Sequence, residues 1–361
     1  MLKTIWTYAE HLPPVPDASR LYLGEGGTPL VKSRYIGKAI GLDHLYFKLE
    51  NLNPTGSYKD RFASVLVSQM RAAGQTVCLA TSSGNTGAAL SAYCAAAGIQ
   101  CVLVVVDGAP LPKIRQMQLY GAEILMVSDF GKSAQVTGHV FAKLTELCQM
   151  HQLPLPISAF HYCPSAMQGV QTMVYEIMEQ LPQAPNHIFS PAGGGGLTLA
   201  MGRGVVSAKA ATKVHCVQPE GNDTIASALR WGQEKAIPVD YSTTRISGLQ
   251  VANVIDGNEV VNTCRQLGGR GYVVTDTEVF NWHQELARRE GIFGEPAGAV
   301  ALTGVVQALR LGELSPSDVV VCPITGSGFK DMNAVERNFG LPDVSAISIA
   351  EGLGRIEQFI S

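Results

Sequence analysis

Residues 77–106 read VCLATSSGNTGAALSAYCAAAGIQCVLVVV. The stretch begins and ends with short apolar runs, 77–80 and 101–106, which lack the polar alternation of a half-exposed strand. Strands that are covered on both faces have this pattern. Between the runs lies an alanine-rich segment, 86–97, which is long enough for about three helical turns. A strand, a helix and a second strand in this order predict a parallel βαβ unit.

The same alternation extends along most of the chain. Further strands are predicted at residues 45–49, 123–127, 187–189, 213–218 and 319–322. Further helices are predicted at residues 60–73, 113–120, 133–150, 168–180, 197–208, 276–290 and 297–311. Alternating strands and helices indicate an α/β fold with parallel-rich twisted sheets that are flanked by helices. The segment 148–156, which contains two prolines, is the best candidate for a domain boundary.

Composition excludes several classes of protein. The 361 residues are 46% hydrophobic and 16% charged, which is typical of a chain with a sizeable core and excludes a disordered one. The net charge is −3 and basic residues form no run, so we expect no nucleic-acid partner. No apolar stretch reaches the roughly 18 residues that span a bilayer. Residues 1–14 lack the apolar middle of a signal peptide, so we predict a cytoplasmic protein.

The cysteines fit this assignment. They are scattered, mostly in apolar surroundings, and no two have the two-residue spacing of a metal-binding pair. We interpret them as reduced, buried, small apolar residues, and we predict no metal site. They are Cys78, Cys94, Cys101, Cys148, Cys163, Cys216, Cys264 and Cys322.

Residues 53–61, NPTGSYKDR, place a lysine where a helix begins. Lys59 falls in the first predicted turn, where a cation opposes the helix dipole and is poorly placed for stability. An amine in a positive, partly desolvated place has a lowered pKa and becomes a nucleophile or a Schiff-base donor. The alternative is a solvated lysine beside Asp60 and Arg61. This segment alone favours the alternative.

Two further loops combine residue types that suit an anion. Residues 81–87, TSSGNTG, lie between a predicted strand and a predicted helix, so their backbone N–H groups and hydroxyls converge at a helix start. Residues 191–197, PAGGGGL, also precede a predicted helix. Four consecutive glycines lose much conformational entropy on folding, and close approach to a phosphate would account for that cost. The alternative for residues 81–87 is a simple helix cap, and the alternative for residues 191–197 is a flexible turn.

A fourth loop follows the last predicted strand. Residues 322–331 read CPITGSGFKD, in which small residues open directly from the strand end. In parallel α/β sheets, ligands bind outside the carboxyl ends of the strands. A threonine or serine hydroxyl there can hydrogen-bond a heteroatom without adding charge.

Together these segments resemble the pyridoxal-phosphate enzymes of the tryptophan synthase β superfamily, also called fold type II. Among them, the threonine synthases are the most similar. The similarity is carried by residues 24–30, 48–61, 82–87, 291–297 and 325–331 in this order, and it extends from about residue 20 to residue 335. The implied fold has two domains: a large cofactor-binding domain (1–54 and 156–361) and a smaller, mobile substrate-binding domain (55–155).

The resemblance also implies a role for each motif. Lys59 would be the catalytic residue and the covalent anchor of pyridoxal 5′-phosphate. Asn85 would bond the 3′-oxygen of the cofactor, Thr325 its pyridine nitrogen, and Glu295 would lie close by. The phosphate would be held by Gly193, Gly194, Gly195, Gly196 and Leu197. The carboxylate of a small amino-acid substrate would be bound by Ser82, Ser83 and Thr86.

The sequence departs from the threonine synthase pattern in places that concern the substrate. Ala166 occupies the position of an arginine that helps to hold the substrate phosphate in that family, and a methyl group does not replace a guanidinium. The four-glycine loop is more similar to that of serine and threonine dehydratases. Ser327 stands where threonine synthases usually have histidine. These residues leave the cofactor site intact.

We therefore expect a pyridoxal-phosphate-dependent lyase that is threonine synthase-like and acts by elimination or replacement at Cβ or Cγ through an external aldimine. The alternative is a dehydratase-like or β-replacing enzyme that acts on serine or on an activated serine. The presence of Lys59 argues against a binding module without catalysis. The sequence also lacks the glycine-rich fingerprint, with a following acidic residue, that a nicotinamide-dependent dehydrogenase would have. The resemblance also implies a homodimer.

Overall fold

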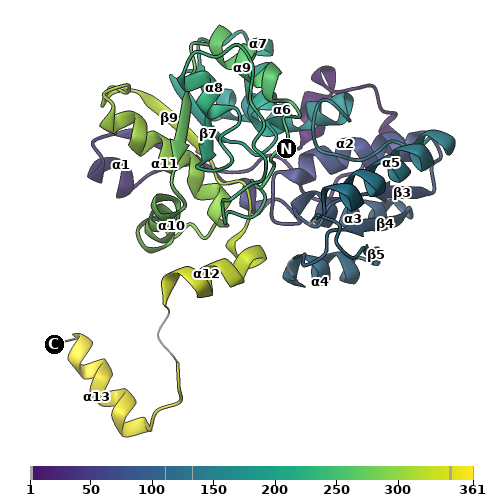
Figure 1. Ribbon diagram of the computed structural model, residues 1–361. Helices are drawn as coiled ribbons and strands as arrows, with labels where there is room; N and C mark the ends of the chain where they lie inside the picture. The colour runs from purple at the N-terminus through teal and green to yellow at the C-terminus, as the bar shows by residue number, and fades with distance from the viewer. Residues whose placement is uncertain (1–2, 110, 132, 341–343, 361) are drawn as a thin grey trace. The chain divides into compact units, whose positions relative to one another are not determined.

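The strands in the described part of the chain form two sheets, which Figure 1 shows in ribbon form. The computed structural model describes residues 3–109, 111–131, 133–340 and 344–360. The chain divides into two units, one up to Asp331 and one from Met332 onwards. Both sheets belong to the first unit.

The larger sheet has six strands in the order β1-β2-β9-β6-β7-β8, and the smaller has three in the order β3-β4-β5. Only β1 and β2 pair in antiparallel fashion; all other pairs are parallel. The strands are β1 (Leu30–Lys32), β2 (His44–Lys48), β3 (Val77–Ala80), β4 (Gln100–Val105), β5 (Glu123–Met126), β6 (His187–Pro191), β7 (Lys213–Pro219), β8 (Gly271–Val274) and β9 (Val319–Pro323).

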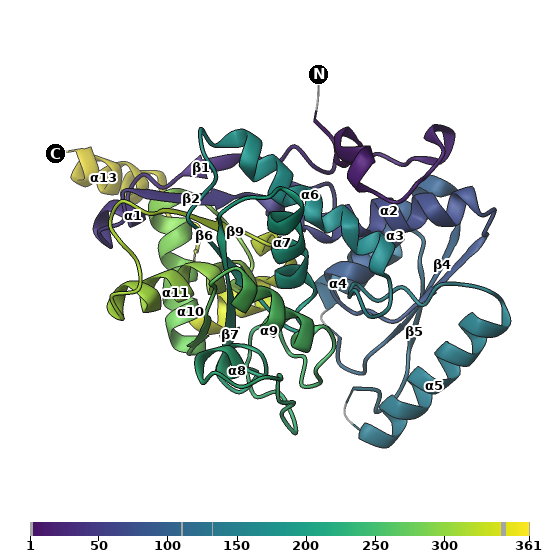
Figure 2. The same ribbon diagram turned by 90° about the horizontal axis from the view of Figure 1, so that it is seen from above.

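Helices cover both sheets, as expected for buried parallel strands. Figure 2 shows α10 and α11 on one face of the larger sheet and α6, α7 and α9 on the other. The α-helices of the first unit are α1 (Ile36–Ala39), α2 (Lys59–Ala72), α3 (Asn85–Ala97), α4 (Leu111–Leu119), α5 (Ala134–Met150), α6 (Pro164–Gln180), α7 (Gly196–Ser207), α8 (Ala226–Arg230), α9 (Gly257–Gln266), α10 (Asp276–Glu285) and α11 (Pro296–Arg310). Short 3-10 turns are η1 (Ile5–His11), η2 (Asp17–Ser19), η3 (Glu50–Leu52) and η5 (Gly328–Asp331), and η4 (Leu286–Glu290) is a π-helical turn.

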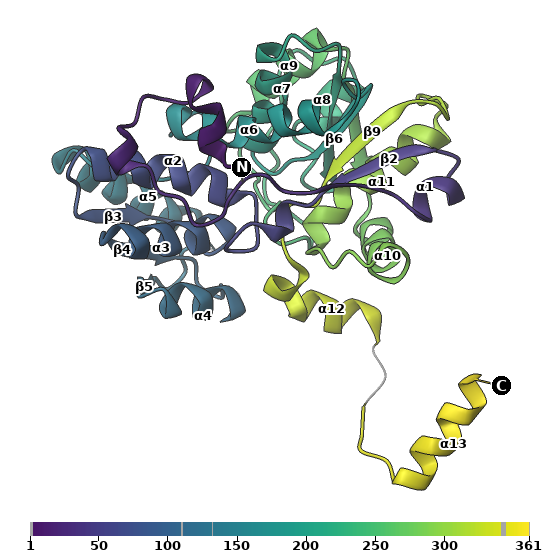
Figure 3. The ribbon, with the colours of Figure 1, turned by 180° about the vertical axis from the view of Figure 1, so that it is seen from behind.

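The smaller sheet has its own covering helices. Figure 3 shows α3 and α4 beside β3–β5, and α3 also packs against α2. Gly98 ends α3 in a left-handed conformation with φ +69°, which returns the chain directly to β4. The strand–helix–strand unit predicted for residues 77–106 is therefore confirmed.

Every predicted strand and helix has a counterpart, and the prediction of an α/β fold with parallel-rich sheets is confirmed. The helix predicted over residues 276–290 ends as an α-helix at Glu285 and continues as η4. The sequence did not predict β1, β8, α1, α8 or α9, nor the two helices at Met332–Phe339 and Ile349–Ile360. Both missed strands are short, at three and four residues, so they carry little periodicity.

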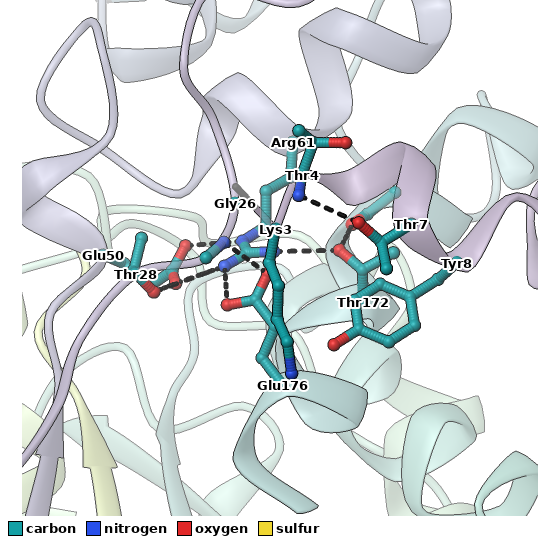
Figure 4. A network of polar contacts seen from close by, with 12 residues as sticks. Lys3, Thr4, Thr7, Tyr8, Gly26, Thr28, Glu50, Arg61, Thr172 and Glu176 are labelled. Atoms are coloured by element: carbon teal, nitrogen blue, oxygen red, sulfur yellow. Dashed lines mark hydrogen bonds and ion pairs between the residues drawn. The ribbon is translucent and has the colours of Figure 1, made fainter. Parts of the chain in front are cut away.

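A buried group of four charges fixes the start of α2 (Figure 4). The Arg61 guanidinium contacts Glu50 at 2.8 Å and Glu176 at 2.6 Å, and Lys48 contacts Glu176 at 2.6 Å. All four side chains are at most 1% exposed. Burial raises the pKa of Glu176, but the charges and hydrogen bonds of Arg61 and Lys48 together outweigh burial and lower the pKa to about 2. Two cations and two anions balance, so the group holds α2 against α6 and η3 without excess charge.

The cysteines are buried and free, as predicted. Three of them, Cys78, Cys94 and Cys101, come from β3, α3 and β4, and their sulfur atoms lie within 4.8 Å of one another. These small side chains allow α3 to pack closely on the sheet.

The second unit contains α12 (Met332–Phe339) and α13 (Ile349–Ile360). Among the described residues, no helix is both long enough and apolar enough to cross a membrane.

Two histidines form a neutral, buried pair at the amino ends of β6 and β7. The amide of Arg270 donates to His215 Nδ1 at 3.0 Å, so that nitrogen is the acceptor. His215 Nε2 then carries the hydrogen and donates to His187 Nδ1 at 2.8 Å. In turn, His187 Nε2 faces Asp318 at 3.3 Å. Burial is the main cause that lowers the pKa of His215 to about 3, and the neighbouring His187, Lys213 and Arg270 contribute in the same direction.

This pair makes the fold sensitive to acid. In the unfolded chain His215 takes up a proton near its ordinary pKa of 6.5, whereas in the fold it does so only near 3. Between about pH 3 and pH 6.5 the unfolded chain binds more protons than the folded one. The stability that the neutral His215 contributes is therefore fully present above about pH 6.5. Below that pH the free energy of unfolding falls by up to about 1.4 kcal/mol per pH unit. We expect His215→Phe to flatten this slope in denaturant titrations at several pH values. His139→Phe, at an exposed position, should leave the slope unchanged. Equal slopes in all three proteins would contradict the assignment.

Candidate functional site

The loop before Lys59 is paired with the loop that follows β9. Ser57 and Gly326 form an antiparallel bridge, and the amide of Tyr58 donates to the carbonyl of Thr325 at 3.1 Å. Lys59 is the first residue of α2, so the helix begins beside the carboxyl end of β9. Ligand sites in parallel sheets lie at this end of the strands.

The Lys59 amine lies among hydroxyl groups and a ring. Its Nζ donates to Ser158 Oγ and lies 4.6 Å from the centre of the Tyr58 ring. Ser158 Oγ is also 3.0 Å from Thr86 Oγ1. Ser158 therefore links the lysine to the loop that begins α3. Sequence reasoning gave Ser158 no role, because no local pattern marks it and its partners are distant in the chain.

The loop after β3 is folded tightly on itself. Ser82 Oγ accepts hydrogen bonds from the amides of Gly84 at 3.3 Å and Gly87 at 3.1 Å. A Cβ atom on Gly87 would lie 2.2 Å from the Ser82 carbonyl oxygen, so only glycine fits there. Asn85 is the first residue of α3, and the first N–H groups of a helix have no partner within it. The loop, which includes half-buried Ser83, can thus offer amides and hydroxyls to an anion.

Asn85 also reaches a buried charged pair. Its Nδ2 donates to Glu295 Oε1, while its Oδ1 is buried and has no hydrogen-bond partner among the described residues. The other Glu295 oxygen is 3.5 Å from the Lys113 ammonium, which also lies 3.3 Å from Ser247 Oγ. Glu295 is 3% exposed and Lys113 is 2% exposed. Sequence reasoning placed Lys113 in a helix but did not identify it as a site residue.

The four-glycine loop joins β6 to α7 and is closely packed. Gly195 has φ +100°, and a Cβ atom there would lie 2.9 Å from a methyl carbon of Val260. A Cβ atom on Gly196 would lie 2.9 Å from the Ser158 carbonyl oxygen. The loop therefore lies beside the segment that contacts Lys59. Gly196 begins α7, and unpaired amides at a helix start suit a phosphate.

Two of the departures from the threonine synthase pattern have clear positions. Ala166 lies in the first turn of α6, is fully buried and belongs to the hydrophobic core. Ser327 lies in the loop after β9, and its amide donates to the carbonyl of Gly56 at 2.8 Å. Position 166 thus supplies no guanidinium, and the serine at 327 helps to hold the loop before Lys59.

Two titratable groups beside this loop have shifted pKa values. Asp60 accepts hydrogen bonds from the amide and hydroxyl of Thr55, yet burial dominates and raises its pKa to about 7. Lys330 donates to the Thr55 carbonyl at 2.6 Å, and burial lowers its pKa to about 8. Both residues occur in segments that sequence reasoning singled out, but no role was predicted for either.

Direct contacts bring the predicted residues to one region, although they come from distant parts of the chain. The lysine and two of the loops meet at Ser158, and the remaining loops meet through the contact of Asn85 with Glu295 and the bridge at Gly326. The role of each residue stays a prediction. The set comprises Lys59, Ser82, Ser83, Asn85, Thr86, Gly193, Gly194, Gly195, Gly196, Leu197, Glu295 and Thr325.

Known proteins share this sequence pattern. A family model described as "Pyridoxal-phosphate dependent enzyme" matches residues 21–326. The threonine synthase of Methanocaldococcus jannaschii is 31% identical to the chain, and the match covers 92% of this chain and 82% of the relative. The threonine synthase of Mycobacterium leprae is 30% identical, and the match covers 98% of this chain and 96% of the relative.

Solved structures share the fold. Threonine deaminase isoform 2 from Solanum lycopersicum has a TM-score of 0.75 at 20% identity, with 94% of this chain and 89% of that chain covered. Serine racemase from Dictyostelium discoideum has a TM-score of 0.71 at 24% identity, with 91% of this chain and 99% of that chain covered. At these identities the likeness is one of fold.

The fold has two α/β sheets, and loops from the carboxyl ends of its strands surround a lysine. Together with the comparisons, this arrangement defines the class of protein. The chain belongs to the family of pyridoxal-phosphate-dependent enzymes, because the family model spans most of its length. Pyridoxal 5′-phosphate is accordingly its cofactor. Among the members, threonine synthases are about 30% identical along nearly the whole chain, so the enzyme is threonine synthase-like. The resemblance drawn from the motifs is confirmed.

Proposed function

We propose that this enzyme is a threonine synthase-like lyase, which carries out elimination or replacement at Cβ or Cγ of a small amino acid. The contact of the Lys59 amine with Ser158, next to Thr86 and the start of α3, is the observation that carries the proposal. It joins a base of suitable chemistry to a loop that can bind a carboxylate. A small amino acid needs both groups in one place.

The residues present fit the cofactor. The glycine loop is packed so closely that a Cβ on Gly195 or Gly196 would clash, and Gly193–Leu197 would hold the phosphate with backbone amides. Asn85 has a buried oxygen without a partner, which marks a polar position that a bound group can complete. We propose that Asn85 faces the 3′-oxygen, Thr325 the pyridine nitrogen, and that Lys59 holds the cofactor covalently. Glu295 would orient Asn85.

Lys59 is proposed to move a proton at the substrate Cα. When bound, pyridoxal phosphate supplies an electron sink for the charge that develops at that carbon. The freed Lys59 amine then takes the α-proton as general base. Ser158 Oγ accepts from Lys59 Nζ, so it orients the amine, and Thr86 fixes Ser158 in turn. Thr325 would be a neutral partner for the pyridine nitrogen of the cofactor, and a neutral partner suits elimination and replacement.

The loop after β3 is proposed to hold the substrate. Ser82, Ser83 and Thr86 would bind its carboxylate with hydroxyls and amides at the positive end of α3. Lys113 is a buried ammonium close to Glu295 and Ser247. We propose that it balances negative charge on the leaving group.

A second candidate function has an observation of its own. Ala166 is fully buried in the core, so no arginine reaches the site from that position. The four-glycine loop is also dehydratase-like in sequence. β-Elimination or β-replacement on serine, threonine or an activated serine is therefore the alternative to γ-replacement.

A substrate panel separates these candidates. It contains small amino acids with their O-phospho and O-acetyl esters, and it records release of inorganic phosphate, acetate and ammonia. Because Ala166 supplies no guanidinium, we expect O-phosphohomoserine to turn over poorly. Efficient phosphate release from it would contradict the inference drawn from Ala166. No turnover of any member would contradict the proposed function.

The glycine loop yields a further prediction. Gly195→Ala combines an unfavourable φ with a contact of 2.9 Å to Val260, so it displaces the amides that would hold the phosphate. We expect cofactor affinity to fall by about 10-fold or more, measured as binding of pyridoxal phosphate by the apoprotein. Gly232→Ala is the matched control, because Gly232 has φ +70° but no atom within 4 Å of the new Cβ. Equal affinities in the two variants would contradict this role.

We also propose the domain division implied by the family. Residues 55–155, with strands β3–β5, would form the smaller mobile domain, and residues 1–54 and 156–361 the larger one. A homodimer in the cytoplasm is proposed on the family resemblance alone. Light scattering of the purified enzyme measures its mass and hence tests the dimer.

A further inference from the structure

Helix α4 presents two polar side chains to the site from one of its faces. Lys113 and Gln116 are three residues apart, so they lie on the same side of the helix. α4 packs against α3 and β5 (Figure 1). It also contacts η5, the turn that follows β9. The helix falls within the proposed smaller domain, whereas η5 falls within the larger one.

Gln116 takes part in a closed triangle of hydrogen bonds. Its Nε2 donates to the Thr55 carbonyl at 3.1 Å, and its Oε1 accepts from Lys330 Nζ at 2.9 Å. Lys330 Nζ also donates to the same Thr55 carbonyl at 2.6 Å. Three segments that are far apart in sequence therefore meet through two side chains and one backbone oxygen.

Burial makes this triangle costly to disrupt. Lys330 is 7% exposed and Thr55 is 3% exposed, so water has little access to them. A buried ammonium must keep its hydrogen-bond acceptors, because losing one leaves a charge without compensation. The charged groups that face Lys330 are Glu295, Asp60 and Lys113.

The fixed point of the triangle is the turn before Lys59. Thr55 is held by Asp60, which accepts from both its amide and its hydroxyl. Asp60 is the neighbour of Lys59 at the start of α2. The carbonyl that receives Lys330 and Gln116 is thus part of a rigid turn, and α4 is the element that the triangle restrains.

One turn of helix separates this restraint from Lys113. The Lys113 ammonium lies 3.3 Å from Ser247 Oγ and 3.5 Å from Glu295, both outside the proposed smaller domain. These distances are long for hydrogen bonds to an ammonium, so they do not hold the helix by themselves. The shorter contacts of Gln116 and Lys330 do so.

We propose that Lys330 and Gln116 are positioning residues: they fix α4 against the Thr55 turn and thereby keep the Lys113 ammonium beside Glu295. This inference rests on the proposed function for the role of Lys113 at the leaving group. Neither residue touches substrate or cofactor in this account. Each acts through the placement of α4.

The first test measures the helix itself and needs no substrate. Hydrogen exchange of the holoenzyme, followed by mass spectrometry, reports opening of residues 111–119. We expect Lys330→Met and Gln116→Leu to speed exchange there by about 10-fold, since each removes hydrogen bonds to a charged group. Gln116→Glu keeps the acceptor for Lys330 and should lie between Gln116→Leu and the wild type. The control Gln118→Leu, at an exposed position of α4, should match the wild type.

The second test asks whether the effect passes through Lys113. On the best substrate of the panel, we expect Lys330→Met to lower kcat/KM by about 10²-fold, as small misplacements near a reacting centre do. In a Lys113→Met background the same change should lower kcat/KM by less than about 3-fold. Gln116→Glu should restore part of the loss seen with Gln116→Leu.

The outcomes separate this inference from the proposed function. An undiminished effect of Lys330→Met in the Lys113→Met background would overturn the positioning role, as would unchanged exchange of residues 111–119. If no amino acid is turned over, the proposed function fails, but faster exchange in Lys330→Met and Gln116→Leu still supports the restraint of α4. If Lys330→Met does not fold, the Gln116 variants provide the same comparison.

Discussion

Lys59→Ala should abolish covalent attachment of the cofactor and lower turnover by about 10²- to 10⁴-fold. The variant loses the amine that lies at the start of α2 and donates to Ser158. The alanine side chain at position 59 has no group that can take the α-proton. Borohydride reduction followed by mass spectrometry measures the attachment, and the substrate panel measures turnover.

The matched control is Lys143→Ala, which removes an exposed lysine from α5. It should retain both the covalently bound cofactor and full activity. Lys59 is only half-buried, so we expect Lys59→Ala to fold, and circular dichroism of both variants checks this. If borohydride still tethers pyridoxal phosphate to Lys59→Ala, another lysine is the anchor, and the proposed mechanism is wrong.

The architecture was predictable because its signals are local. Continuous apolar runs such as 101–106 indicate strands that are covered on both faces, and the glycine at position 98 ends a helix where the next strand begins. The strand β8 was missed because four residues carry little periodicity and its place depends on packing against β7. The helix α9 was missed although its buried residues, Gly257, Val260, Val261 and Cys264, recur at helical spacing. Likewise, no local pattern shows that β9 inserts between β2 and β6.

The same distinction between local and long-range signals decides which site residues the sequence could predict. Lys59, Asn85 and the glycine loop lie in segments whose residue types are costly for structure alone, so the sequence points to them. Ser158, Lys113 and Lys330 were given no role, because their chemistry depends on contacts with residues 99 to 275 positions away. A common serine or lysine becomes informative only once the fold brings a partner to it.

Arg61→Met should destabilise the fold by about 3–5 kcal/mol, although Met fills a similar volume. Arg61 lies between the buried carboxylates of Glu50 and Glu176 (Figure 4). Removing it leaves Lys48 as the only cation of the group. One negative charge then remains uncompensated where no side chain of the group is more than 1% exposed. Denaturant titration of the wild type and the variant measures the difference.

The exposed pair of Arg310 and Glu278 provides the control. Arg310 is 61% exposed, so Arg310→Met should change stability by less than about 1 kcal/mol. The double variant Arg61→Met with Glu176→Gln removes the uncompensated charge, and we expect it to recover part of the stability that Arg61→Met loses. No recovery would mean that the loss comes from packing rather than from charge. In that case the balanced group of four charges would not be what fixes the start of α2, and the placement of Lys59 would depend on the paired loops at Ser57 and Gly326 instead.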